Sequence, residues 1–130
     1  MFKDIEDLDI YKIIENLCDE IWNEIIKWNY FAQDTIGKQL VRAIDSIGAN
    51  LVESGGRYHH RDSLNFLYFA RASARETRYW LKRAKNRGLI NPKKIDIYVA
   101  QINTFSKRLN ALINSRRKRL EKLIIREYNK

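Results

Sequence analysis

The chain has 130 residues, of which 45% are hydrophobic and 32% are charged, with five glycines and one proline. This composition predicts one globular domain of long helices, and the single cysteine, Cys18, excludes an intramolecular disulfide. The first residues show no signal-peptide pattern, and no apolar run is long enough to cross a membrane. We therefore expect a soluble, cytoplasmic protein.

The net charge of +9 is unevenly distributed along the chain. Residues 1–60 carry 6 Lys and Arg against 11 Asp and Glu, a net charge of −5, whereas residues 61–130 carry 19 against 5, a net charge of +14. A positive field of this size attracts polyanions. The asymmetry therefore favours a protein that binds nucleic acid.

Apolar residues recur every three or four positions in four segments, which predicts four amphipathic helices. We expect helices over about residues 9–29, from a cap at Asp34 to Gly55-Gly56, from near Asp62 to Gly88, and from Pro92, after the cap Asn91, toward Tyr128. The predicted inward positions are Ile10, Ile14, Leu17, Ile21, Ile25 and Trp28; Ile36, Leu40, Ile44, Ile47 and Leu51; Phe66, Phe69, Ala70, Ser73, Thr77, Trp80, Leu81 and Ala84; and Ile95, Tyr98, Ile102, Phe105, Leu109 and Leu112.

Four such helices joined by short turns predict an all-α, antiparallel up-and-down four-helix bundle over residues 1–115. Residues 116–130 are expected to form a basic amphipathic extension of the last helix. Gly55-Gly56 is expected to end the second helix in the left-handed conformation that glycine tolerates. Gly37 and Gly48 are expected to allow another backbone to approach that helix closely.

Basic residues form one stripe on the predicted third helix, at steps of four, three, four and three positions. The stripe consists of Arg71, Arg75, Arg78, Lys82 and Lys85, with Arg83 beside it and Tyr68 and Tyr79 at its edges. Like charges at this spacing repel one another, so retaining them indicates a role outside the fold. One interpretation is a phosphate-contacting ridge with tyrosines that stack on bases, because guanidinium groups suit phosphate. The other is a solvated helix face.

A second basic cluster lies in the extension: Arg116, Arg117, Lys118, Arg119, Lys122 and Arg126. It has the same two interpretations, and binding to a membrane surface is a third, less favoured one. Leu120, Leu123 and Ile124 add an apolar strip to this segment.

The turn before the third helix holds Arg57 and Arg61 around His59-His60. With backbone donors after Gly55-Gly56, the two arginines could contact a phosphate, although a polar turn is the simpler interpretation. The histidines lack the spacing of a metal site, and Cys18 lies on an apolar face, as a core residue would. With no catalytic constellation recognisable, we expect neither an enzyme nor a cofactor or metal.

Several motifs in this chain resemble one known family. They are Ser46-Ile47-x-x-Asn50-Leu51-Val52-Glu53-x-x-Gly56-Arg57, then Phe66-Leu67-x-x-Ala70-Arg71-x-Ser73-x-x-Glu76, then Ala84-x-x-x-Gly88-Leu89-Ile90, and an opening Phe2-Lys3-Asp4-Ile5-x-x-Leu8-x-Ile10-Tyr11. Together they resemble the four-helix-bundle proteins encoded in intervening sequences of bacterial 23S ribosomal RNA genes. Gly48, Ser54, Gly55 and Ala72 depart from the family pattern.

The resemblance implies an antiparallel bundle that assembles into a homopentameric barrel. It also implies kinship with the accessory variability determinant of diversity-generating retroelements, a basic pentamer that binds a reverse transcriptase and nucleic acid. Asn50, Glu53, Gly56, Arg57, Ser73 and Glu76 match the family motif, and we expect them to be structural, with Arg57 pairing with Glu53 or Glu76.

The sequence thus leads to two hypotheses from different classes. The first is a non-catalytic, homopentameric protein that binds RNA or DNA, as the partner of a reverse transcriptase in a retroelement. The alternative is a structural scaffold of the ribosomal RNA intervening-sequence type, whose basic face docks an acidic protein partner.

Overall fold

The computed structural model describes residue 5, residues 8–57 and residues 59–130, and the opening Phe2-Lys3-Asp4 and Tyr58 lie outside the described residues. The elements are α1 (Asp9–Ile25), α2 (Tyr30–Ala32), the π-helical turn η2 (Gln33–Gly37), α3 (Lys38–Gly55), α4 (His60–Asn86) and α5 (Pro92–Tyr128). No strand occurs among these described residues.

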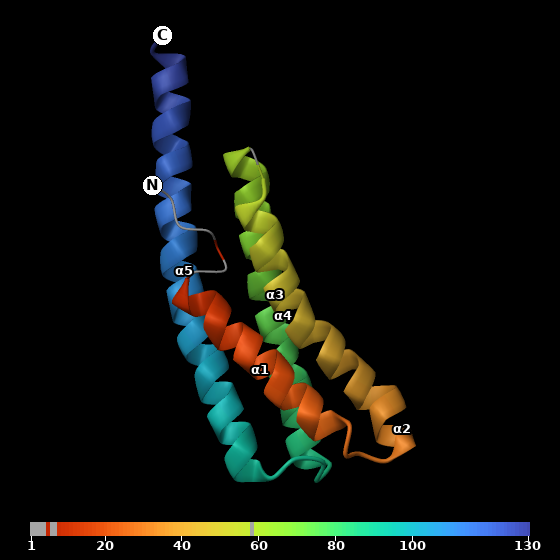
Figure 1. The fold of residues 1–130 in the computed structure, drawn as a ribbon. Coiled ribbons are helices and arrows are strands. Elements are labelled where there is room, and N and C mark those ends of the chain that lie inside the picture. Colours follow the sequence, from red (N-terminus) through yellow and green to blue (C-terminus); the bar gives the residue numbers. More distant parts are fainter. Residues whose placement is uncertain (1–4, 6–7, 58) are drawn as a thin grey trace.

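The four long helices form a bundle in which successive helices run in opposite directions (Figure 1). α1 crosses in front of the others and packs on α3 and α5, while α4 packs on α3 and α5 from the other side. α2, η2 and α3 follow one another without a break and act as one bent helix. The C-terminal part of α5 extends beyond the ends of the other helices (Figure 1). The expected all-helical bundle and the extension of its last helix are both present.

The core contains the apolar stripes that periodicity predicts for α1, α3 and α5. Phe105, Ile14 and Leu40 are fully buried at its centre, and all five stripe positions expected over Ile36–Leu51 are buried. Burying one such side chain stabilises the fold by about 1.5–3 kcal/mol relative to leaving it exposed. Trp28 and Leu112, at the ends of their stripes, are only half-buried.

The inward face predicted for α4 is partly wrong. Phe69 is 54% exposed, whereas Leu64, Leu67 and Ala74 are buried. The prediction placed Phe69 inward, but α4 turns Leu64, Leu67 and the small Ala74 inward instead. Phe66 and Phe69 instead pack edge to face, with ring centroids 5.7 Å apart. Ala70, Thr77, Leu81 and Ala84 are buried as predicted, so the error is confined to the aromatic positions and to the missed residues Leu64, Leu67 and Ala74.

Two helix ends also differ from the prediction. The first helix ends at Ile25 instead of near residue 29, and the next begins at Tyr30, where the Asn29 side chain accepts a hydrogen bond from the Ala32 N–H at 3.0 Å. Asp34 is not the cap, because it lies inside the π-helical turn and pairs with Lys38 at 2.6 Å. The sequence pattern does not reveal the Asn29 cap, because the apolar stripe of the second helix begins only at Ile36.

The glycines at the helix ends play different roles. Gly88 ends α4 with a φ of +69°, as expected, but Gly56 has a φ of −89°, so the predicted left-handed end of α3 is wrong. Gly55 is required for another reason, since a Cβ there would lie 2.8 Å from the Ile5 Cγ2. Gly37 does allow close approach, because a Cβ at that position would lie 3.0 Å from the Ile25 Cγ2, whereas a Cβ at Gly48 would make only an ordinary contact.

Candidate functional site

The stripe predicted on the third helix lies along the seam between α4 and α5. Arg71 Nη1 donates to Asn110 Oδ1 at 3.4 Å, Arg78 Nη1 donates to Ser106 Oγ at 3.0 Å, and Lys85 Nζ pairs with Asp96 Oδ1 at 3.1 Å. These residues are seven positions apart, so they recur after two helical turns and reach the antiparallel α5 in order. Arg75 and Lys82 are exposed on the solvent side of this row.

The hydrogen-bond partners of Arg71 and Arg78 are neutral oxygen atoms. In the described part of the chain, the ion pairs that join Lys or Arg to a carboxylate include Lys85 but not Arg71, Arg75, Arg78 or Lys82. Arg71 also lies over the Tyr68 ring, 5.0 Å from its centroid. Such contacts hold a guanidinium in place without cancelling its charge. Arg71 and Arg78 are therefore oriented, and of the stripe residues only Lys85 is paired with a carboxylate among the described residues.

Arg83 has a different environment from the stripe. Its guanidinium lies over the Tyr79 ring at 5.5 Å, and its Nε is buried without a hydrogen-bond partner among the described residues. Tyr79 in turn packs edge to face on Trp80 at 4.9 Å. Both tyrosines expected to stack on bases, Tyr68 and Tyr79, thus already contact arginines of the protein itself.

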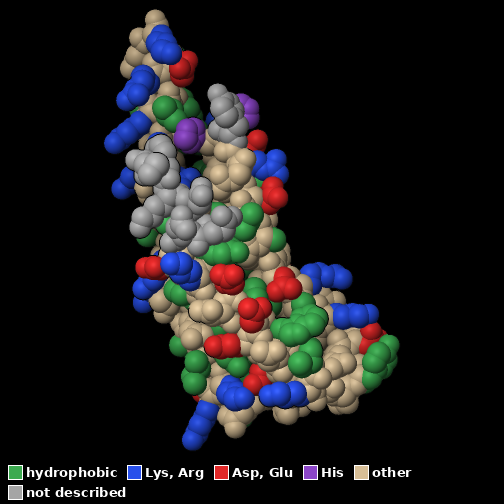
Figure 2. Space-filling view, viewed as in Figure 1, with side chains coloured by type: hydrophobic (Ala, Val, Ile, Leu, Met, Phe, Trp, Pro, Cys, Tyr) green, Lys and Arg blue, Asp and Glu red, His purple; other side chains and the backbone are tan. Residues whose placement is uncertain are grey.

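The second basic cluster lies on the part of α5 that extends from the bundle, where Figure 2 shows Lys and Arg side chains projecting from its end. Arg117, Lys118, Lys122 and Arg126 are exposed there. Arg116 is half-buried, and its burial, followed by the neighbouring Arg119 charge, lowers the pKa of its guanidinium. The cluster therefore presents a second cationic surface that is separate along the chain from the stripe.

The apolar strip of the extension faces the start of α4. Leu120, Leu123 and Ile124 line a groove of about 360 Å³ together with His59, His60 and Arg61. The histidines and Arg61 therefore lie beside the extension, whereas Arg57 has other neighbours.

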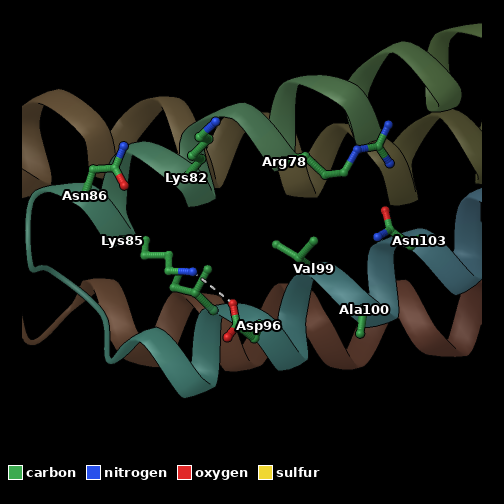
Figure 3. A pocket seen from close by; sticks show the side chains of 9 residues that line it. Arg78, Lys82, Lys85, Asn86, Asp96, Val99, Ala100 and Asn103 are labelled. Atoms are coloured by element: carbon green, nitrogen blue, oxygen red, sulfur yellow. Dashed lines mark hydrogen bonds and ion pairs between the residues drawn. The ribbon is translucent and has the colours of Figure 1, made fainter.

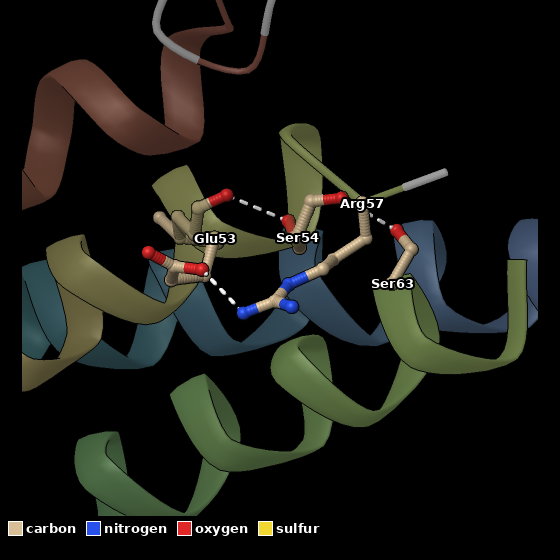
Figure 4. Close-up of polar contacts among 5 residues, drawn as sticks. Glu53, Ser54, Arg57 and Ser63 are labelled. Atoms are coloured by element: carbon tan, nitrogen blue, oxygen red, sulfur yellow. Dashed lines mark hydrogen bonds and ion pairs between the residues drawn. The ribbon is translucent and has the colours of Figure 1, made fainter. Parts of the chain in front are cut away.

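Arg57 makes its contacts within the turn between α3 and α4 and with the helices beside it (Figure 4). Its Nη2 pairs with Glu53 Oε2 at 2.7 Å, and its guanidinium lies 4.5 Å from the centroid of the Phe66 ring. The Gly56 N–H, one of the expected phosphate donors, instead donates to the carbonyls of Val52 and Glu53. These contacts are those of a polar turn, the simpler of the two interpretations of this segment. Glu53, not Glu76, is the partner of Arg57.

Two serines for which the sequence predicts no role hold this turn together. The Ser54 Oγ donates to the Leu51 carbonyl at 2.6 Å, and the Ser63 Oγ donates to the Ser54 carbonyl at 2.8 Å (Figure 4). Both side chains are buried. A buried hydroxyl with a backbone partner is a structural element, and the sequence offers no sign of these hydrogen bonds, since Ser54 stands out only as a departure from the family pattern.

The polar residues of the family motif on α3 and α4 bond mostly within their own helices, and one contact, between Ser73 and Ser46, joins the two helices. Asn50 Nδ2 donates to the Ser46 carbonyl at 2.8 Å, and Ser73 Oγ contacts Ser46 Oγ at 3.1 Å. Thr77 Oγ1 donates to the Ser73 carbonyl at 2.8 Å. Glu76 accepts from Trp80 Nε1 at 3.3 Å. All of these contacts are made within the protein itself.

Cys18 lies against α3, where its Sγ donates to the Ile44 carbonyl at 3.5 Å. Burial, and then the Asp45 charge, raise the pKa of this thiol from 9.0 to about 12, which disfavours the reactive thiolate. Within the described ranges, no three His, Cys, Asp or Glu side chains gather as a metal site would require. None of the described helices is long and apolar enough to cross a membrane.

The structure also contains a groove that the sequence pattern does not predict. It lies between the end of α4 and the start of α5, has a volume of about 480 Å³, and is shown in Figure 3. Arg78 and Lys82 of the stripe line it, opposite Val99 and Asn103 of α5. Only the pairing of α4 with α5 brings these residues together, so neither helix reveals the groove by itself.

The fold and the stripe define an all-helical bundle with a cationic seam. The chain belongs to the 23S rRNA-intervening sequence protein family, whose model matches residues 6–111. It is similar in fold to a crystal structure of a protein of unknown function from the S23 ribosomal protein family of Bacteroides thetaiotaomicron, at 24% identity and a TM-score of 0.71. The similarity covers 80% of this chain and 97% of that one. No curated protein matches the chain.

Proposed function

We propose that this protein is a non-catalytic accessory protein that binds RNA or DNA through the cationic stripe of α4. The observation that carries the proposal is the set of neutral partners of the stripe. Arg71 and Arg78 are held by Asn110 and Ser106, so two guanidinium groups are positioned but not neutralised. Positioned arginines with uncompensated charge suit phosphate oxygens, which they can contact in a bidentate manner.

The extension of α5 supplies the second surface of this proposal. Its exposed cations continue the positive charge beyond the bundle (Figure 2). A nucleic-acid strand that contacts both surfaces would neutralise more phosphates than the stripe alone reaches. Because each neutralised phosphate releases counterions, the affinity of such a complex depends steeply on salt.

A salt titration of binding tests the proposal. Fluorescence anisotropy with labelled RNA and DNA, measured from 50 to 200 mM salt, should show the affinity falling roughly a thousandfold if about six phosphates are neutralised. A flat salt response would contradict the proposal.

A charge-reversed variant locates the site. Replacing Arg71, Arg75 and Arg78 with Glu should lower the affinity at least a hundredfold, because three phosphate contacts become repulsive. The matched control replaces the exposed Lys12, Lys27 and Arg42 with Glu, which changes the net charge equally on other parts of the molecule. Equal losses in both variants would show that only net charge matters, and circular dichroism verifies that both remain folded.

We propose further that the protein assembles as a homopentamer and that this pentamer is the partner of a reverse transcriptase. The resemblance to the accessory variability determinant supports both parts. The acidic first half and basic second half suit head-to-tail contacts, which a ring requires. A pentamer of 15.6 kDa chains has five times that mass, about 78 kDa, and five times the charge of +9, or +45. Light scattering coupled to size exclusion checks the mass, and pull-down with a reverse transcriptase encoded beside the gene checks the partner.

An exposed apolar patch favours the second candidate, a scaffold that docks an acidic protein. Trp22 and Ile26 of the α1 end are 53% and 55% exposed, and they line a groove of about 450 Å³ with Val41 and Arg42. Apolar side chains beside a cation are typical of protein interfaces. Co-purification with and without nuclease separates the two candidates, because a protein-only complex survives digestion of the nucleic acid.

A further inference from the structure

The groove between α4 and α5 combines a cationic rim with an apolar floor. Arg78 and Lys82 form its rim on α4, and Val99 points into it from α5 (Figure 3). Ile95, which is fully buried, and the half-buried Val99 make its floor apolar. A phosphate would contact the rim, but an apolar floor offers nothing to a phosphate. The groove therefore suits a ligand that has both an anionic and a flat, weakly polar part.

We infer that this groove receives an unpaired nucleobase, so that the protein prefers single-stranded nucleic acid to a duplex. The inference rests on the proposed function, since it assigns the kind of nucleic acid that the stripe contacts. In a duplex the bases are stacked and paired, and only the backbone would reach the rim. In a single strand a base can turn away from its neighbours into the groove while its phosphates stay on Arg78 and Lys82.

Two amide side chains support a base as the occupant. Asn86 and Asn103 line the groove, and no hydrogen bond to the side chain of either occurs within the described part of the chain. An amide presents both donors and an acceptor, which is the combination that the edges of bases require. Figure 3 shows Asn103 on α5 facing Arg78 on α4 at the same end of the groove. A base on Val99 would thus have polar groups near both of its ends.

The charges of the groove also define where the backbone passes. The Asp96 carboxylate lies at one end of the groove, where it pairs with Lys85 at 3.1 Å. A negative charge there repels phosphate. The other end is open to Arg78, which has a neutral partner. We therefore place the backbone of the strand along Arg75, Arg78 and Lys82, away from Asp96.

The test compares a fluorescein-labelled single-stranded RNA of twelve uridines with the duplex that it forms with its adenosine complement. The wild-type protein should bind the single strand at least tenfold more tightly at the same salt concentration. Replacing Val99 with Met fills the groove without a change in charge and should lower single-strand affinity on the order of tenfold, the typical value of one base contact, while duplex affinity stays within about twofold.

A matched control and two further variants test whether the effect is specific to the groove. Ile97→Met makes the same kind of change on the same helix but on an exposed side chain outside this groove, and should alter neither affinity. Asn103→Ala removes one amide from an exposed position, so it cannot fail by unfolding the core, and should lower single-strand affinity about threefold to tenfold. Asp96→Asn should instead strengthen binding of both nucleic acids, because it removes a repulsive charge and frees Lys85.

The outcomes separate the inference from the function on which it rests. A result in which binding depends on salt, has equal affinity for single strand and duplex, and is unchanged by Val99→Met and Asn103→Ala would overturn the inference that the groove receives a base. It would not overturn the proposal that the stripe binds nucleic acid. No binding of either nucleic acid would overturn the proposed function itself. Competition by free uridine monophosphate at concentrations comparable to those of the strand would also overturn the inference, because it would make the groove a mononucleotide site.

Discussion

The two sides of α4 use polar residues in opposite ways. On the buried side, Ser73 and Thr77 make their hydrogen bonds inside the protein, and Ala70 and Ala74 are fully buried. On the side that borders α5, the cations of the stripe are exposed or half-buried and have mostly neutral partners. One helix thus carries a structural face and a candidate binding face.

The two faces of α4 therefore differ in role: one holds residues needed for folding, and the other holds residues available for binding. A polar group whose hydrogen bonds are all made within the protein contributes to stability, and its loss leaves a buried partner unsatisfied. A cation without a carboxylate partner costs little to remove and can meet an external anion. Stability and binding should therefore respond to different substitutions on the same helix.

The largest expected effect concerns the face of α4 that is buried. Leu67→Ala should lower the free energy of unfolding by about 2–5 kcal/mol, because Leu67 is 1% exposed and its loss leaves a cavity. Phe69→Ala, on a residue that is 54% exposed, should cost far less, and urea denaturation of both variants measures the difference. A larger loss from Phe69→Ala would mean that an assembly buries this ring.

The extension should matter for binding more than for folding. Deleting residues 116–130 removes 7 Lys and Arg and 2 Asp and Glu, a net charge of +5, from a helix end that extends past the bundle. We expect the salt dependence of binding to become less steep and the affinity to fall at least tenfold, since fewer phosphates are neutralised. The unfolding midpoint should change little. An unchanged salt slope would confine binding to the stripe.

A smaller effect tests the hydrogen bonds on the structural face. Thr77→Val replaces a fully buried hydroxyl that donates to the Ser73 carbonyl at 2.8 Å, and should cost about 1 kcal/mol of stability without changing nucleic-acid affinity. Arg75→Ala, on the exposed stripe, should do the reverse and lower affinity with little change in stability. Thermal unfolding measures the stability of each variant, and fluorescence anisotropy measures its affinity for nucleic acid. If both variants lose both stability and affinity, the two faces do not have separate roles.

The smallest effect is the reactivity of Cys18 on the packed side of the bundle. Because burial raises the pKa of its thiol to about 12, alkylation at pH 8 should be at least tenfold slower in the native protein than in urea. The raised pKa also makes the stability of the fold depend on pH. The contribution of the Cys18 thiol to the free energy of unfolding is complete below the ordinary pKa of 9.0 and is lost as pH rises toward about 12. Cys18→Ala should therefore flatten the alkaline loss of stability, and equal slopes would show that the thiol is not protected.

Local rules were sufficient to predict much of this protein. The stripes of α1, α3 and α5, the Asn91 cap with Pro92, and the end of α4 at Gly88 depend on spacing and on backbone preferences that a residue carries with it. The basic stripe follows from the same helical period. Each of these features is set within a few turns of the chain, so the sequence alone determines them.

Tertiary structure decided the rest. Which side of α4 is buried depends on its neighbours, since Leu64, Leu67 and Ala74 are buried while Phe69 is 54% exposed. Asn110 and Ser106 became partners of the stripe, and Val99 became the floor of a groove, only because α5 lies beside α4. Contacts between residues far apart in the chain depend on packing, and helical period determines a helix face but not the neighbour that covers it.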